Sequence, residues 1–144
     1  MASIHPPRSN AWADRRAPDL AAFEAMASET LAQLPHEFLS RCGQLQVTLA
    51  DFAPDDLLDA MGIEDPYELL GIFEGSPFTE EVSSLVSSQM PNRIWLFRRA
   101  IVDYWAGGDE SLGEVVAHVL IHEIGHHFGL SDQDMERIEA AVER

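Results

Sequence analysis

The sequence contains no lysine and a single cysteine, Cys42, and its acidic residues far outnumber the basic ones. One cysteine excludes an internal disulfide and favours a reducing compartment, and we expect Cys42 to be a small core residue. The 25 acidic residues against nine arginines give a net charge of −16. This charge repels nucleic-acid phosphates and anionic lipid head groups, so we expect no nucleic-acid partner. The charge either attracts a basic partner or, as the simpler interpretation, keeps the protein in solution.

A long apolar run and a secretory signal are also lacking. No stretch approaches the roughly 20 apolar residues that span a bilayer. The first 17 residues carry prolines and charges where a signal peptide has its apolar region. We therefore expect a cytoplasmic protein with no membrane partner. Residues 1–17 are predicted to be a flexible N-terminal tail and residues 18–144 a single domain, since 46% of the chain is hydrophobic and can build one core.

The apolar pattern of this domain predicts both helices and strands. Apolar residues three and four positions apart predict a helix over 18–34, and an alternating pattern predicts a strand over 44–52. Two further apolar runs, at 69–75 and 92–97, also read as strands. Residues 74–92 are rich in serine, proline and glycine and predict a long loop.

A later helix carries the candidate metal ligands. Ser111 and Glu114 form a capping-box pattern, so a helix should begin near residue 112. His122 and His126 are four positions apart in it, which places their imidazoles about 40° apart around the axis, where both can bind one metal ion. Glu123 is offset from both, as suits a general base that takes a proton from water activated by the metal.

A third ligand is predicted after the end of this helix. Gly129 can adopt a positive φ, which would end the helix and return the chain toward the ion. Asp132 would then bind through its carboxylate, favoured by the amide dipoles of a new helix starting there. The predicted cofactor is one Zn²⁺ ion with three protein ligands and one water. Cobalt or manganese also suits a set of two histidines and one aspartate.

Two more histidines lie on the same helix. His118 shares a face with His122, but it lies about 12 Å along the axis from His126, too far for both to bind one ion. It either lines the cleft or sits at the rim of the core. His127 is turned about 100° from His126 and is not expected to be a ligand. It could contact a ligand, donate to the transition state, or make an ordinary polar contact.

The stretch HEIGHHFGLSD, residues 122–132, resembles the HExxHHxGxxD signature of the minimal zincin-like family, short bacterial, metzincin-related proteins predicted to be zinc proteases. The resemblance extends upstream through 34–52, 69–78 and 92–101. It implies an α+β fold in which helices flank a small mixed sheet and the HExxH helix lies near the C-terminus. It also implies that His122, His126 and Asp132 bind the zinc and that Glu123 is the base.

The leading hypothesis is a zinc-dependent metalloendopeptidase that acts on a peptide or protein substrate. An extended peptide would pair with an exposed sheet edge, at 69–75 or 92–97. The alternative is a non-catalytic interaction or regulatory module, in which the zinc joins the two C-terminal helices. Hydrolysis of a non-peptide amide is a third possibility. The fourth coordination position of the zinc distinguishes the enzyme from the interaction module. In catalytic sites it is open to water or substrate, whereas in structural sites a protein ligand occupies it.

Overall fold

The computed structural model describes residues 11–40, 42–75 and 92–142. The described chain contains both helices and short strands, as the apolar pattern predicts. They are α1 (Leu20–Gln33), α2 (His36–Ser40), β1 (Leu45–Ala50), α3 (Asp55–Met61), the 3₁₀ helix η1 (Pro66–Glu68), β2 (Gly71–Glu74), β3 (Asn92–Phe97), α5 (Arg98–Ala106), α6 (Leu112–His127) and α7 (Asp132–Val142). The predicted loop over 74–92 falls mostly outside the described residues, as does most of the predicted tail.

The three described strands form one mixed sheet in the order β1-β3-β2. β3 is parallel to β1, with Val47 opposite Ile94, and antiparallel to β2, with Phe73 opposite Ile94. The expectation that residues 92–97 offer a free edge to a peptide is therefore wrong, because β3 pairs on both sides. Within the described residues β2 pairs with β3 alone, so the edge expected at 69–75 remains.

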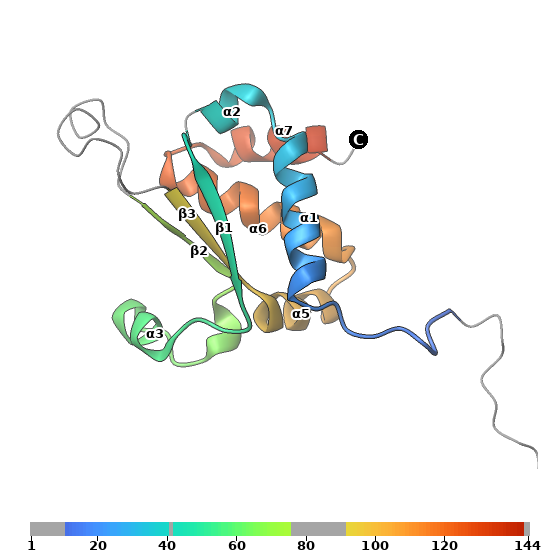
Figure 1. Ribbon diagram of the computed structural model, residues 1–144. Coiled ribbons are helices and arrows are strands. Elements are labelled where there is room, and N and C mark those ends of the chain that lie inside the picture. The colour runs from blue at the N-terminus through green and yellow to red at the C-terminus, as the bar shows by residue number, and fades with distance from the viewer. Residues whose placement is uncertain (1–10, 41, 76–91, 143–144) are drawn as a thin grey trace, which may run out of the picture.

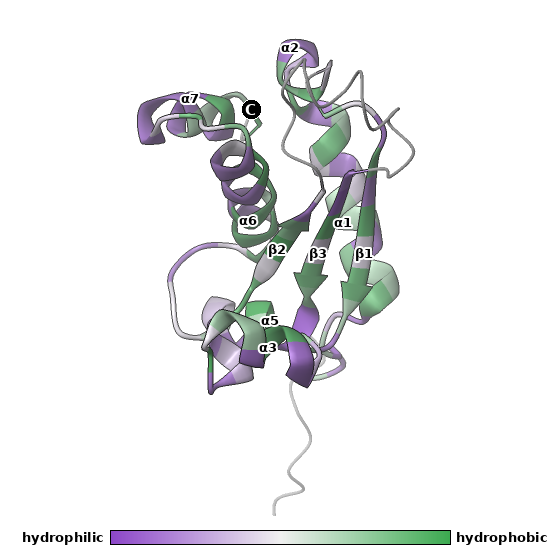
Figure 2. Cartoon of the chain, turned by 90° about the vertical axis from the view of Figure 1, so that its left-hand side faces the viewer, coloured by the Kyte–Doolittle hydropathy of each residue, from purple (hydrophilic) through white to green (hydrophobic). Residues whose placement is uncertain are grey.

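Helices α1 and α6 pack on each other and on one face of the sheet (Figure 1). The core between these layers is apolar and includes Phe23 from α1, Ile94 from β3 and Leu120 from α6, all fully buried. Hydrophobic positions dominate α6 and the strands, whereas α7 is mostly hydrophilic (Figure 2). This arrangement is the expected α+β fold, a small mixed sheet flanked by helices, with the HExxH helix near the C-terminus.

The single cysteine lies in this core, as expected. Cys42 is 1% exposed, and burial raises the pKa of its thiol to about 11. Its side chain donates to the carbonyl of Phe38 at 3.6 Å. A thiol of this kind stays protonated at neutral pH and has the character of a small apolar residue, not of a nucleophile or a metal ligand.

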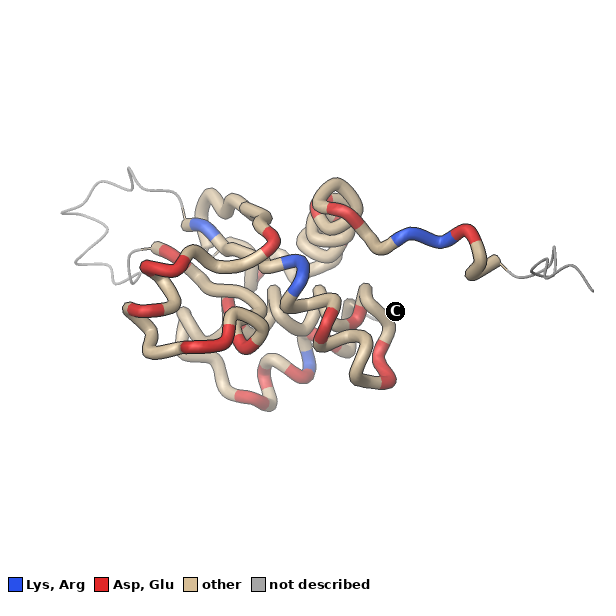
Figure 3. The backbone as a smooth tube through the Cα atoms, turned by 90° about the horizontal axis from the view of Figure 1, so that it is seen from below, with Lys and Arg blue, Asp and Glu red and all other residues tan. Residues whose placement is uncertain are grey.

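Acidic residues lie on several surface elements, among them α3 and α7. Figure 3 shows them along α3 and the segment after it. Asp51 is paired there with Arg98 at 2.7 Å, and this hydrogen bond lowers the pKa of the Asp51 carboxyl. No helix of the described chain is long and apolar enough to cross a membrane.

Candidate active site

Helix α6 carries most of the candidate site and is fixed at both ends by local interactions. Ser111 caps its N-terminus by accepting from the Glu114 amide at 3.1 Å, as the capping-box pattern predicts. At the C-terminus Gly129 has a φ of +73°, and its amide donates to the carbonyl of His126. The Leu130 amide donates to the carbonyl of Gly125 at 2.9 Å. These two bonds form a Schellman motif, so Gly129 ends the helix as predicted.

The next helix, α7, crosses α6 closely because Gly125 has no side chain. A β-carbon at Gly125 would lie 2.8 Å from Cγ of Met135 and closer still to its sulfur. Met135 is fully buried at this crossing, and Ser131 caps α7 by accepting from the Asp134 amide at 3.1 Å. Met135 and Glu139 are one turn apart and share a face of α7. The close contact therefore brings Glu139 against the turns of α6 that precede Gly125.

The HExxH pair lies in the C-terminal half of α6. His122 is half-buried, His126 is exposed, and their ring centroids are 5.7 Å apart at an interplanar angle of 84°. Burial lowers the pKa of His122, the nearby His118 lowers it further, and Glu139 opposes this shift. A neutral imidazole is the form that binds a metal. The pair is thus close to solvent and carries the donor atoms that zinc uses.

Glu123, the predicted base, is half-buried beside this pair. Burial raises the pKa of its carboxyl above the ordinary value, and His126 acts in the opposite direction. Desolvation of this kind strengthens a carboxylate as a proton acceptor, which is what general base catalysis requires.

Asp132, the predicted third ligand, is the first residue of α7 and is exposed. The structure does not bring the ligand atoms of His122, His126 and Asp132 within 4.8 Å of one another as a set. Among the described residues, the set that meets this distance is His118, His122 and Glu139. The ligand role of Asp132 stays a prediction.

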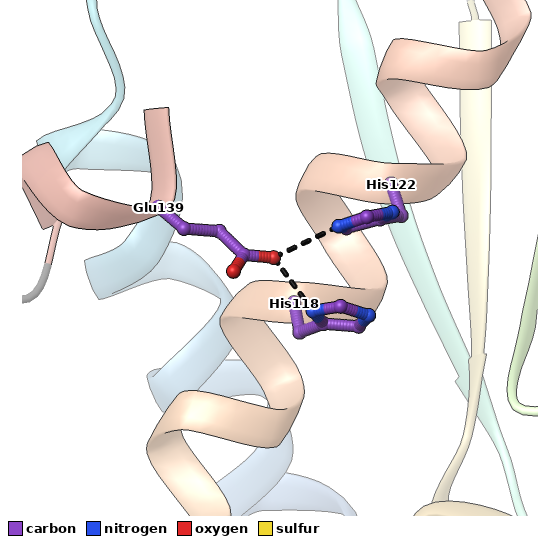
Figure 4. A group of neighbouring side chains, drawn as sticks. All are labelled: His118, His122 and Glu139. Atoms are coloured by element: carbon purple, nitrogen blue, oxygen red, sulfur yellow. Dashed lines mark ion pairs between the residues drawn. The ribbon is translucent and has the colours of Figure 1, made fainter. Parts of the chain in front are cut away.

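The set that does converge is drawn in Figure 4. Oε1 of Glu139 lies 2.6 Å from Nδ1 of His118 and 3.0 Å from Nε2 of His122. The rings of His118 and His122 stack, with centroids 3.9 Å apart. The sequence analysis missed Glu139. A signal was present, however, since Glu139 lies one turn after Met135 in the helix predicted to start at Asp132.

His127 points toward the sheet. Its ring is half-buried and stacks on Phe73 of β2, with centroids 3.9 Å apart and an interplanar angle of 23°. This contact ties the end of the HExxH helix to the edge strand. A role for His127 beside a ligand or a substrate stays a prediction.

The residues of this site fit a zinc ion. Imidazole nitrogens and a carboxylate oxygen are zinc ligands. Oε1 of Glu139 is buried and, in the described chain, has no hydrogen bond. A carboxylate oxygen buried in this way is unfavourable unless a donor or a cation satisfies it. A divalent cation held by His118 and His122 would do so, whereas for the HExxH pair the fit rests on its two imidazole donors.

The comparison with known families gives one match. A family model described as zincin-like metallopeptidase matches residues 42–142, which is more than half of the chain and includes the whole sheet, α6 and α7. The chain belongs to this family of zincin-like metallopeptidases. No curated protein matches the chain.

Proposed function

We propose that this protein is a zinc-dependent endopeptidase in which Glu123 is the general base. The observation that carries the proposal is the half-buried Glu123, with its raised pKa, next to two histidines in the C-terminal half of α6. A purely structural metal site has no use for such a base. Membership in the family supports the reaction class.

His122 and His126 would hold the zinc, with a carboxylate as third ligand, for which Asp132 is the predicted residue. Zinc supplies polarisation of the scissile carbonyl and a lowered pKa for the attacking water. A carboxylate oxygen of Glu123 accepts the proton of that water and then gives it to the leaving amine. Burial of Glu123 keeps this oxygen poorly solvated, so the proton transfer stays within the site.

The substrate is proposed to be an extended peptide that lies along β2. Within the described residues β2 is an outer strand of the sheet and packs beside α6. Main-chain hydrogen bonds to an edge strand bind a peptide without strong sequence preference. The contact of Phe73 with His127 supports this position, because it sets the edge strand against the HExxH turn. The net charge of −16 favours basic substrates. A cytoplasmic location stays a prediction.

A mass-spectrometric cleavage screen tests this function. The zinc-loaded protein is incubated with a diverse peptide library, and the metal-free protein with a chelator serves as the blank. We expect cleavage by the zinc-loaded protein alone, with basic residues enriched around the cleaved bond. No cleavage, with zinc shown to be bound, would favour the interaction module instead.

A further inference from the structure

A second set of metal-ligating side chains lies one turn before the HExxH pair. His118 and His122 come from successive turns of α6, and Glu139 reaches them from α7 (Figure 4). The three ligand atoms lie within 4.8 Å of one another. The His118 side chain is 45% exposed, whereas those of His122 and Glu139 are 22% and 23% exposed. The set therefore has two sheltered ligands and one that faces solvent.

One carboxylate oxygen of Glu139 faces both histidines of this set. Its Oε1 is buried and has no hydrogen bond from any described residue, although two imidazole nitrogens lie 2.6 Å and 3.0 Å away. A buried carboxylate oxygen that faces two imidazole nitrogens forms, with them, a set of three zinc-type ligand atoms around one point.

The distances are near those of a zinc site. Tetrahedral zinc with bonds of about 2.0–2.1 Å holds its ligand atoms roughly 3.4 Å apart. The observed separations of 2.6 Å and 3.0 Å are shorter, so the carboxylate of Glu139 must withdraw by roughly 0.4–0.8 Å to admit the ion. The carboxylate of Glu139 is the end of a flexible side chain and can make this shift. The solvent beside His118 leaves room for a fourth ligand.

We propose that His118, His122 and Glu139 form a second divalent-cation site, which shares His122 with the HExxH pair. Because both sites need the same nitrogen of His122, they compete for it. Nε2 of His122 is the atom that faces Glu139, and one nitrogen binds one ion. An ion in the second site therefore uses the Nε2 atom that would bind an ion together with His126. Only one of the two sites can be occupied at a time. The second site joins α6 to α7 and holds the metal away from Glu123.

Zinc binding by four full-length proteins tests this proposal: the wild type, His126→Ala, Glu139→Gln and the double variant. Stoichiometry is measured by equilibrium dialysis with metal analysis, and affinity by competition with a chelator. We expect the wild type and both single variants to bind one zinc per chain. The double variant should bind at least about tenfold more weakly than His126→Ala, because it lacks a ligand of each site.

The controls separate the site from folding and from catalysis. Glu136→Gln removes an exposed carboxylate of the same helix and should leave zinc affinity unchanged in the His126→Ala background. Because the side chains of His126 and Glu136 are exposed, their replacement leaves the core packing in place, which far-UV circular dichroism checks. Loss of zinc binding in His126→Ala, or equal affinity of His126→Ala and the double variant, would overturn the proposal. Cleavage is not measured, so a failure of the proposed peptidase activity would not affect this result.

Discussion

Replacement of Glu123 by glutamine is expected to slow peptide cleavage by roughly 10²–10⁴-fold while zinc remains bound. Glutamine has nearly the same shape as glutamate, but its amide cannot accept the proton of the attacking water. Glu123 is half-buried, and its offset from the ligand face of α6 excludes it from the metal. The loss should therefore appear in kcat and leave the zinc content at the wild-type value.

The matched control for this variant is Glu114→Gln. Glu114 lies in the first turn of the same helix and is exposed, so the charge change is the same but far from the HExxH turn. Turnover of a reporter peptide and bound zinc are measured for both variants. Equal turnover of Glu123→Gln and the wild type would remove Glu123 from the mechanism.

Replacement of Gly125 by alanine is expected to destabilise the protein, whereas the same change at Gly113 should stabilise it. The added β-carbon at Gly125 overlaps the buried side chain of Met135. Overpacking of this kind costs about 1–3 kcal/mol. Gly113 lies in the first turn of α6 with nothing within 4 Å of an added β-carbon. Alanine there gains helix propensity, worth up to about 1 kcal/mol.

Thermal unfolding of the metal-free proteins measures both changes. Gly125→Ala should lower Tm by roughly 3–9 °C for a chain of this size, and Gly113→Ala should leave it equal or higher. Comparison of the two variants isolates the effect of core packing on stability, because both add one methyl group to the same helix. A Tm for Gly125→Ala at or above that of the wild type would mean that α6 and α7 do not cross as closely as described.

The parts of the site that local rules govern could be predicted from the sequence. The helix start at Ser111, the helix end at Gly129 and the new helix after Ser131 each follow from one or two residues and their backbone preferences. The placement of His122 and His126 on one side of α6 follows from helix periodicity alone. For this reason the HExxH turn, with Glu123 as its proposed base, could be predicted from the sequence, whereas the half-burial of Glu123 could not.

The parts that depend on tertiary packing could not be predicted. Glu139 meets His122 because α7 crosses α6 at Gly125, and no local pattern gives a crossing between two helices. The central position of β3 likewise follows from pairing with two strands distant in the sequence. Short apolar strands carry no signal for their order in a sheet.

The central claim is that the HExxH pair holds zinc with one coordination position open to water. A crystal structure of the zinc-loaded wild type, with anomalous diffraction at the zinc edge, tests it most directly. The account predicts zinc on His122 and His126, a carboxylate as third protein ligand, and solvent in the fourth position beside Glu123. Zinc with four protein ligands, or zinc held only by His118, His122 and Glu139 and not by His126, would contradict a catalytic centre.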